Sequence, residues 1–352
     1  MYRSPSYEVL SSFFEKFFLM SFSRFMFLGT SSAVPRPGHR NVSAMMIQYS
    51  CGSITLVDCG EATQHQLMRS TVRMGNIDNV FLTHLHGDHC YGLFGLMHTL
   101  NMGGRTTPVN LFGPKGVQEL VHTVFRLTGG WDAFELNITE LEPEKLHSFD
   151  LKSPSHKGII ASVMACPMVH RVPAFGYVFK EPDQPLSLDG EKAKQLGATG
   201  PALGRLKSGH DVPLDDGTVI RSTDVTNPGR PARTIGIMQD TCDSSRAVPF
   251  MQGCDLLVHE STYDKSRYEQ AIQYGHATSV MAAEIAKEVA AKNLVLTHFS
   301  SRYGANGENE ILRTEAQVVL SGQDCEVVLA EDFMCIAGEE FREISSILKP
   351  DT

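Results

Sequence analysis

The letters THLHGDH mark the segment of this chain whose residue types are best suited to bind metal. The segment directly follows an apolar run, Val80–Leu82, that predicts a β-strand. If the strand continues, His84 and His86 point the same way because they are two residues apart. The glycine turn that follows brings Asp88 and His89 around a second point. Imidazole and carboxylate groups suit zinc, so this loop offers ligands to two metal ions.

A chance cluster is the alternative, since the chain contains 14 histidines and histidine is common on surfaces. An ordered pattern of strand followed by H-x-H-x-D-H is rarely produced by chance, and its mechanism fits its place in the chain. The loop also has no cysteine ligand. These residues therefore predict a catalytic metal site that keeps a position for water.

Three further apolar runs stop at or just before a side chain that binds metal. They are Ser162–Val169 before His170, Thr234–Met238 before Asp240, and Leu294–Thr297 before His298. Ligands of α/β folds bind beyond the carboxyl ends of strands, so we expect one shared site. Taken singly, each residue is better explained as a satisfied core histidine or a turn aspartate. The first motif reverses that preference.

Strand and helix signals alternate from Arg24 onward, which predicts an α/β fold. Periodicity predicts helices at 63–73, 92–100 and 279–291, and strands at 25–28, 44–49, 54–57, 80–82, 109–112, and near residues 162, 175, 234, 256 and 294. Residues 1–23 lie outside this pattern and carry an irregular apolar cluster around Phe13 and Phe17. We expect a disordered extension there, with a targeting peptide or a start at Met20 as alternatives.

Composition narrows the class of protein. At 352 residues with 42% hydrophobic content the chain can bury a sizeable core, and no run of 18 apolar residues suggests a membrane span. The eight cysteines have no C-x-x-C spacing, which indicates reduced thiols of an intracellular protein. Cys90 could be proposed as a ligand, but we expect it to pack in the core. The net charge of −9 argues against broad nucleic-acid binding and leaves room for a shaped substrate.

Several phrases resemble one family, and they occur in order from Arg24 to Ala337. They are FLGTSSAVP at 27–35, VDCGEATQ at 57–64, THLHGDH at 83–89, HRVPAFGY at 170–177, HEST at 259–262, GHATS at 275–279 and LTHFSSRY at 296–303. Together they are similar to short-form ribonuclease Z, a metallo-β-lactamase-fold endonuclease that matures tRNA 3′ ends. The resemblance implies an αββα sandwich of two mixed sheets with outer helices, in domain 24–345, plus a protruding arm. It also implies two zinc ions per subunit and a homodimer.

The resemblance assigns a role to each candidate ligand. His84, His86 and His170 would hold one zinc ion, Asp88, His89 and His298 the other, and Asp240 would bridge them. Asp88 would also orient or deprotonate the attacking water. Two departures from the family pattern are present: Gln239 stands where the family usually has glycine, and HEST replaces HEAT. Glutamine tolerates fewer backbone angles than glycine, so the turn before Asp240 is expected to be affected.

The resemblance points to His276 as the proton donor to the leaving oxygen, oriented by Glu260. The alternative is that His276, beside Thr278, only caps the helix that follows. Arg302 is a candidate phosphate clamp, because a guanidinium group matches phosphate in bidentate fashion.

The stretch between Glu181 and Asp224 is rich in proline, glycine and charge, and a loop this long is usually functional. Within it, residues 183–212 resemble the family's tRNA-binding arm, and they hold the candidate substrate contacts Gly200, Pro201, Arg205 and Lys207. The alternative is a solvated surface excursion.

The leading hypothesis is a zinc-dependent endoribonuclease that removes the 3′ trailer of precursor tRNA after the discriminator base. Such a cut leaves a tRNA 3′-hydroxyl and a 5′-phosphate on the trailer. A hydrolase of a small ester, such as a phosphodiesterase, is the main rival, because a fold does not fix a substrate. A catalytically silent tRNA-binding protein is the third possibility. We expect an intracellular protein of the cytoplasm or nucleus, with the mitochondrion as a further candidate compartment.

Overall fold

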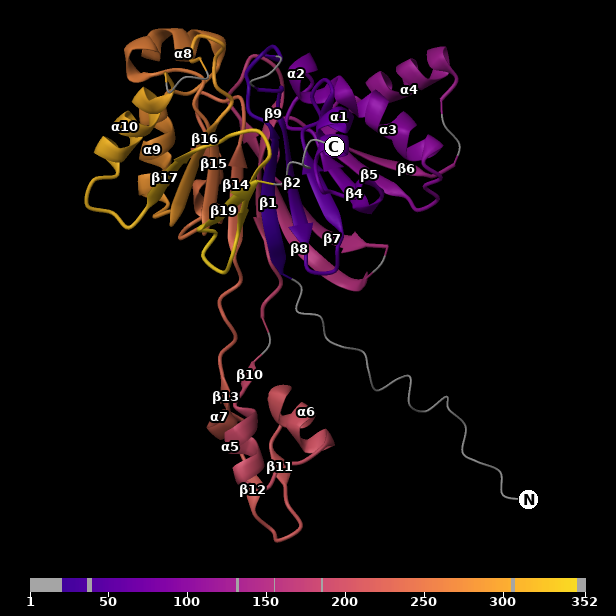
Figure 1. The fold of residues 1–352 in the computed structure, drawn as a ribbon, viewed down its shortest axis with the longest axis vertical. Helices are drawn as coiled ribbons and strands as arrows, with labels where there is room; N and C mark the ends of the chain where they lie inside the picture. Colours follow the sequence, from indigo (N-terminus) through magenta and orange to yellow (C-terminus); the bar gives the residue numbers. More distant parts are fainter. Residues whose placement is uncertain are drawn as a thin grey trace. The chain divides into compact units, whose positions relative to one another are not determined.

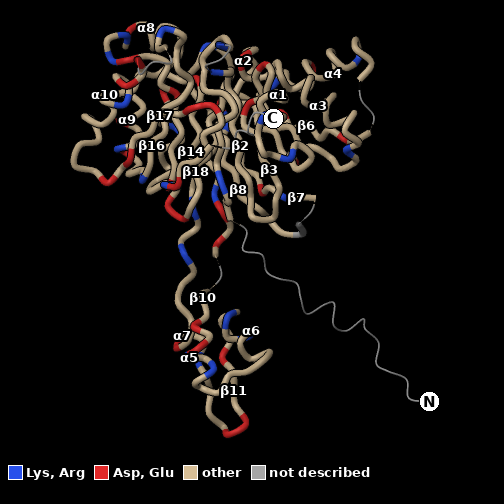
Figure 2. Tube along the Cα trace, in the orientation of Figure 1, with Lys and Arg blue, Asp and Glu red and all other residues tan. Residues whose placement is uncertain are grey.

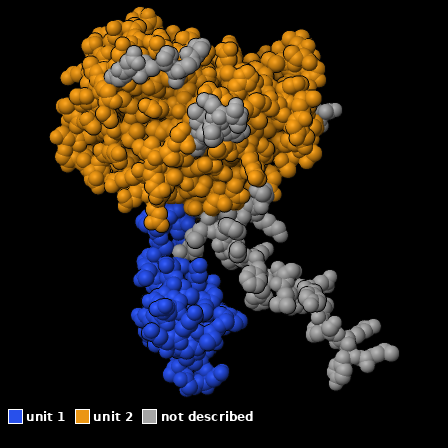
Figure 3. Space-filling model, in the orientation of Figure 1, with its two compact units in different colours: residues 1–20, 183–231 blue, residues 21–182, 232–352 orange. Residues whose placement is uncertain are grey.

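The computed structural model describes residues 21–36, 40–130, 133–154, 156–184, 186–304 and 308–346. The described chain forms two compact units, a larger one from residues 21–182 and 232–346 and a smaller one from residues 183–231 (Figure 3). The apolar cluster around Phe13 and Phe17 lies outside the described residues.

Two mixed β-sheets form the centre of the larger unit. The first has the order β19-β18-β1-β2-β3-β4-β5-β6 and the second the order β17-β16-β15-β14-β9-β8-β7. The strands of the first sheet are β1 (Phe22–Gly29), β2 (Ala44–Tyr49), β3 (Ile54–Val57), β4 (Ile77–Phe81), β5 (Val109–Pro114), β6 (Leu136–Leu141), β18 (Met334–Ala337) and β19 (Glu343–Ser346). Those of the second are β7 (His147–Ser153), β8 (His156–Met168), β9 (Ala174–Lys180), β14 (Thr234–Met238), β15 (Leu256–Glu260), β16 (Asn293–Thr297) and β17 (Glu326–Leu329).

Helices cover the outer sides of the sheets, with α1, α3 and α4 on one side and α9 and α10 on the other (Figure 1). The helices of this unit are α1 (Thr63–Arg69), η2 (Met74–Asn76), α2 (Gly87–Cys90), α3 (Gly92–Met102), α4 (Val117–Thr128), η3 (Ser245–Phe250), η4 (Lys265–Arg267), α8 (Tyr268–Tyr274), α9 (Ser279–Glu288) and α10 (Glu310–Val319). The predicted α/β sandwich of two mixed sheets with outer helices is confirmed. No helix among the described residues is long and apolar enough to cross a membrane.

Aromatic side chains from both sheets pack together in the layer between them. The ring of Phe81 in β4 lies 5.0 Å from that of Tyr177 and 5.4 Å from that of Phe179, both in β9. The hydroxyl of Tyr177 donates to the carbonyl of Leu82, and the N–H of Phe175 donates to the carbonyl of Thr83. These contacts fix the end of β4 against the second sheet, directly before the metal-binding motif.

Several predicted boundaries differ from the structure. Strand β4 ends at Phe81, so His84 and His86 lie in a loop, and strand alternation does not explain their common direction. Helix α1 ends at Arg69 rather than at residue 73, where the N–H of Ser70 donates to the carbonyls of Gln66 and Leu67. Strand β1 begins at Phe22, whose side chain is buried.

The smaller unit is built from short elements around a small apolar core. They are β10 (Ser187–Leu188), α5 (Gly190–Gln195), α6 (Pro201–Lys207), β11 (Val212–Pro213), β12 (Val219–Ile220), α7 (Ser222–Val225) and β13 (Thr226–Asn227). Its core consists of Ala193, Ala198, Leu206, Val212, Ile220 and Val225. The charged side chains of this unit are spread over its short helices and turns (Figure 2). The unit begins where the arm was expected to begin and continues past residue 212.

Candidate metal centre

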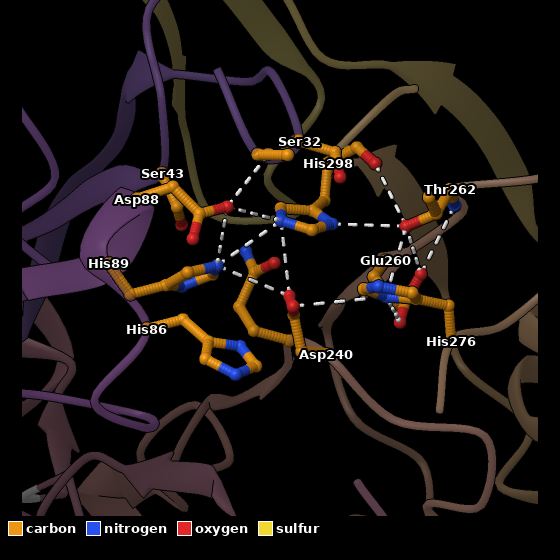
Figure 4. Close-up of polar contacts among 12 residues, drawn as sticks. Ser32, Ser43, His86, Asp88, His89, Asp240, Glu260, Thr262, His276 and His298 are labelled. Carbon is orange, nitrogen blue, oxygen red and sulfur yellow. Dashed lines mark hydrogen bonds and ion pairs between the residues drawn. The ribbon is translucent and has the colours of Figure 1, made fainter. Parts of the chain in front are cut away.

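The side chains predicted as metal ligands converge beyond the carboxyl ends of strands from both sheets. Figure 4 shows five of them: His86, Asp88, His89, Asp240 and His298. The first sheet contributes the loop after β4 and the short helix α2, and the second contributes the residues just after β8, β14 and β16. The structure groups them as His84, His86, His170 and Asp240, as Asp88, His89 and His298, and as Asp240, His276 and His298. This cluster is capable of binding metal.

Asp240 lies between the two groups, with one carboxylate oxygen facing each. Its Oδ2 atom is 3.5 Å from Nε2 of His84 and 3.9 Å from Nε2 of His170. Its Oδ1 atom is 3.1 Å from Nε2 of His298 and 3.3 Å from Nε2 of His89. A carboxylate placed in this way can bridge two cations.

The inner nitrogens of the histidines face one another at short range. Nδ1 of His86 is 3.0 Å from Nε2 of His84 and 3.3 Å from Nε2 of His170. In the other group, Nε2 of His89 is 3.2 Å from Nε2 of His298. Lone pairs gathered in this way repel unless a proton or a cation lies between them.

The outer nitrogens of these histidines have partners that fix the orientation of each ring. Nδ1 of His170 donates to the carbonyl of Gly275 at 2.7 Å, which leaves Nε2 as the lone-pair atom. Nδ1 of His84 is 3.1 Å from the hydroxyl of Thr83, and Nδ1 of His298 is 3.0 Å from the hydroxyl of Thr262. A hydrogen bond on the outer nitrogen is the usual arrangement for histidines that bind metal.

Asp58, which had no predicted role, orients His89. It is fully buried, and its Oδ2 atom accepts a hydrogen bond from Nδ1 of His89 at 2.7 Å. It also accepts from the N–H and the hydroxyl of Thr83 and from the hydroxyl of Ser43. Asp58 directly follows β3 and has a φ of 60°, a backbone conformation uncommon for residues other than glycine. Its position at a strand end was the signal in the sequence.

The buried polar atoms fit a cation. Oδ1 of Asp240 is buried and accepts no hydrogen bond from the described residues. Burial lowers the pKa values of His84, His86 and His170, which keeps these rings neutral, as metal ligands must be. Burial alone would raise the pKa of Asp240, but His298, His89 and His84 hold it well below its usual range. Neutral imidazoles around an ionised carboxylate form a suitable donor set for a divalent metal.

The pKa values of Asp88 and His89 are shifted in opposite directions within the second group, and a metal ion bound there would displace the proton of His89. Burial would raise the pKa of Asp88, but His89 and His298 hold it well below its usual range. Burial would lower the pKa of His89, but Asp240, Asp58 and Asp88 raise it well above. The N–H of Ala33 donates to Oδ2 of Asp88 at 2.7 Å and fixes this carboxylate.

His276 and Glu260 form a buried pair next to the cluster. Nδ1 of His276 is 3.0 Å from Oε1 of Glu260 and 3.8 Å from Oδ2 of Asp240. Burial would lower the pKa of His276, but the carboxylate of Glu260 raises it to about 9. The same carboxylate accepts from the N–H groups of Thr241 and Thr262. Glu260 therefore links His276 to Thr241, which follows Asp240, and to Thr262, whose hydroxyl contacts His298.

A cleft of about 420 Å³ opens beside the cluster. It is lined by Ser32, Ala33, Val34, Pro35, Val42, Glu61, His86, Gly87, Asp88, Tyr91, Arg171, Asp240 and His276. Arg302, the predicted phosphate clamp, is not among these residues. Its side chain is exposed, donates to the hydroxyl of Ser300 and lies 5.7 Å from the ring of Tyr263. The other predicted substrate contacts, Gly200, Pro201, Arg205 and Lys207, lie in the smaller unit.

We expected Gln239 to disturb the turn before Asp240, but the backbone at this position is not strained. Gln239 is not among the residues with positive φ, so its position does not require glycine. Its side chain is buried, and its amide nitrogen is 3.5 Å from Sδ of Met45. Its amide oxygen has no hydrogen-bond partner among the described residues.

Comparisons with known proteins show which family the whole chain is similar to. The chain is 40% identical to ribonuclease BN of Cronobacter sakazakii over 314 residues, which covers 88% of this chain and 98% of that protein. It is 37% identical to ribonuclease Z of Acaryochloris marina over 313 residues, 88% of this chain and 95% of that protein. The crystal structure of human tRNase Z, short form, matches with a TM-score of 0.62 and 29% identity over 89% of this chain and 98% of that one. A family described as anti-Pycsar protein Apyc1 matches residues 23–160.

Proposed function

This chain belongs to the ribonuclease Z family, and on that premise we propose that it is a metal-dependent endoribonuclease acting on precursor tRNA. It cuts after the discriminator base, leaves a 3′-hydroxyl on the tRNA, and releases a trailer with a 5′-phosphate. The observation that carries the proposal is the position of Asp240, with one oxygen toward each group of histidines beside an open cleft.

We propose zinc as the metal, with two ions per subunit. His84, His86 and His170 would hold one ion, Asp88, His89 and His298 would hold the other, and Asp240 would serve both. When bound, such a pair of ions polarises phosphate oxygens and lowers the pKa of a water molecule at the site. The donor set of imidazole and carboxylate without cysteine supports zinc in a catalytic site.

Asp88 orients the attacking water in this proposal. Its carboxylate lines the cleft and is fixed by the N–H of Ala33, so one oxygen keeps a set direction. Its depressed pKa keeps it ionised at neutral pH, as an acceptor for a proton of that water must be. The in-line attack then displaces the ribose 3′ oxygen from phosphorus.

His276 donates a proton to the departing oxygen. Its ring lines the cleft, and its pKa near 9 leaves it protonated at neutral pH. Glu260 keeps the ring in place through the hydrogen bond to Nδ1, which turns Nε2 away from Glu260. The rival role, a cap for the following helix, is filled by Thr278, whose hydroxyl accepts from the N–H of Met281 at the start of α9.

Recognition of tRNA is assigned to the smaller unit and to Arg302. Gly200 and Pro201 begin α6, and the side chains of Arg205 and Lys207 on this helix are exposed and available to phosphates. Arg302 is exposed and can contact a phosphate farther from the cut. Homodimerisation is proposed from the family resemblance alone. An intracellular location agrees with the eight free thiols.

Incubation of the purified protein with a precursor tRNA that carries a 3′ trailer tests this proposal. We expect one cut, mapped by gel after the discriminator base, that stops with chelator and returns with added zinc. Cleavage that continues in the presence of chelator contradicts the proposal. Hydrolysis of a chromogenic phosphodiester without cleavage of the tRNA also contradicts it. Binding of the tRNA without any cleavage would identify a silent tRNA-binding protein.

A further inference from the structure

Among the cleft residues without a role in the mechanism above, two have side chains suited to bind a nucleotide. They are Tyr91, between α2 and α3, and Arg171, directly after His170. Both line the cleft together with Asp88, Asp240 and His276.

The ring of Tyr91 lies against Gly87 and is exposed to solvent. Its side chain is 65% exposed, although it stands beside a buried cluster. A Cβ atom at Gly87 would lie 2.2 Å from Cε2 of Tyr91, so the ring lies against this glycine and any side chain there would displace it. Exposed aromatic residues are common on surfaces, and Tyr268 is 50% exposed elsewhere. Tyr91 differs because its supported ring borders the cleft.

Arg171 is the single lysine or arginine among the described residues that line the cleft. Its side chain is exposed, and its guanidinium group lies 5.7 Å from the ring of Tyr274. It has no ion pair or hydrogen bond with another side chain in the described part of the chain. Glu61 and Asp88 on the same lining are acidic, so a phosphate near them needs a cation close by. A free guanidinium group supplies one.

We propose that Tyr91 and Arg171 form a nucleotide subsite next to the scissile phosphate. The base of the flanking nucleotide stacks on Tyr91, and the neighbouring phosphate pairs with Arg171. Unpaired RNA bases commonly stack on aromatic side chains, and arginine binds phosphate in a fixed fork geometry. The inference rests on the proposed function, because it specifies how the same cleft holds the RNA strand.

Tyr91 is tested with variants of both enzyme and substrate. Precursor tRNAs are prepared with an abasic nucleotide on either side of the cut, and kcat/KM is measured for the wild type, Tyr91→Phe and Tyr91→Ala. Stacking of one base on an aromatic ring corresponds to a change of about tenfold or more. We expect Tyr91→Ala to lose about that factor on the normal substrate and Tyr91→Phe to stay within about threefold of the wild type. On one of the two abasic substrates, Tyr91→Ala and the wild type should be equally slow.

Arg171 is tested in the same manner with a neutral methylphosphonate linkage next to the cut. Arg171→Gln should raise KM severalfold on the normal substrate and reduce the salt dependence of binding by about one phosphate contact. The loss should vanish on a substrate with the neutral linkage. Tyr268→Ala and Arg126→Gln are matched controls, because both side chains are exposed and neither lines the cleft.

Three results overturn the subsite. The first is an equal loss of kcat/KM by Tyr91→Ala, relative to the wild type, on the normal substrate and on both abasic substrates. The second is a Tyr91→Phe variant that unfolds at the wild-type temperature but is as slow as Tyr91→Ala. The third is a rise in KM by Arg171→Gln that persists on every substrate with a neutral linkage. Absence of cleavage by the wild-type protein contradicts the proposed function itself. Normal wild-type cleavage with any of the three results contradicts the subsite alone.

Discussion

The metal-binding cluster and the smaller unit show opposite relations between charge and burial. In the cluster, His84, His89 and Asp240 are buried, and their rings and carboxylates are fixed by residues behind them. In the smaller unit, Arg205 and Lys207 extend into solvent from a helix whose buried residue is Leu206. The side chains of the cluster are oriented by buried hydrogen bonds, whereas Arg205 and Lys207 of the smaller unit are exposed charges.

This difference suggests that the two regions contribute to different steps. Chemistry needs groups held to a fraction of an ångström, because the charge that develops in a transition state is met by preorganised groups. Recognition of a large polyanion needs accessible cations, and its strength falls with salt. Substitutions in the cluster should therefore change kcat, and substitutions in the smaller unit should change KM for tRNA.

The largest effect is expected from Asp240→Ala. Both groups of histidines lose the carboxylate that faces them, so bound metal should fall below two ions per chain and cleavage should become undetectable. Metal content by elemental analysis and the rate of tRNA cleavage measure this. Asp243→Asn is the matched control, since Asp243 is exposed three residues farther on. Normal metal content together with normal cleavage in Asp240→Ala would rule out the bridging role.

His276→Ala should affect the chemical step and leave the metal in place. A general acid contributes about 10² to 10⁴ in rate, so kcat should fall by that factor while metal content and KM stay near normal. His122→Ala is the control, because His122 is exposed on α4. Loss of metal from His276→Ala would instead assign this histidine to the ligand set.

The pH dependence of kcat follows from the same residue. The pKa of His276 is raised to about 9, so the proton is present below that pH and is lost as the pH rises through it. The kcat of the wild type should therefore fall as the pH rises through about 9, and the kcat of His276→Ala should not show this fall. A pH profile of the wild type and the variant at saturating substrate measures it.

A further prediction concerns the larger unit at the points where the chain leaves it and returns. Glu181 and Arg233 are buried, and Nη2 of Arg233 lies 2.8 Å from Oε1 of Glu181. Arg233→Met removes the guanidinium group from this buried carboxylate and leaves it with backbone N–H donors such as those of Phe22 and residue 233. Loss of the buried ion pair should lower the free energy of unfolding by roughly 3–5 kcal/mol. Glu181→Gln combined with Arg233→Met should recover part of that loss. Urea unfolding measures both, and an equal loss in the two variants would show that charge is not the cause.

The smallest effect is expected from Arg205→Gln combined with Lys207→Gln. Removal of two phosphate contacts should weaken binding of precursor tRNA severalfold and lower the slope of log affinity against log salt by about two. The value of kcat and the hydrolysis of a chromogenic phosphodiester should stay unchanged. Lys287→Gln on α9 is a control outside the smaller unit. An unchanged salt slope would remove these side chains from the tRNA contact.

The sequence predicted that the proposed metal ligands would come together, because each of them follows a strand. The apolar runs place His170, Asp240 and His298 just after strands of the second sheet. The THLHGDH motif, which follows a strand of the first sheet, indicates that these residues form one site. Asp58 also follows a strand, but its contact with His89 depends on a positive φ that the pattern of apolar residues does not reveal.

Other features could not be predicted from local patterns. The loop that carries His84 and His86 takes its conformation from Thr83, which is fixed by Asp58 and by the N–H of Phe175. Arg171 lines the cleft and Arg302 does not, a difference that no local sequence pattern reveals. The folded core of the smaller unit was also missed, because its strands are only two residues long and alternate too briefly.

The division of labour is tested most directly by deletion of residues 183–231, which removes the smaller unit and none of the proposed ligands. Binding energy from remote parts of a substrate helps only a substrate that has those parts. The ratio of kcat/KM on precursor tRNA to kcat/KM on a chromogenic phosphodiester should fall by about 100-fold or more, with the phosphodiester rate within a few-fold of the wild type. If the ratio is unchanged, whether both rates fall together or neither falls, recognition and chemistry are not divided between these two regions.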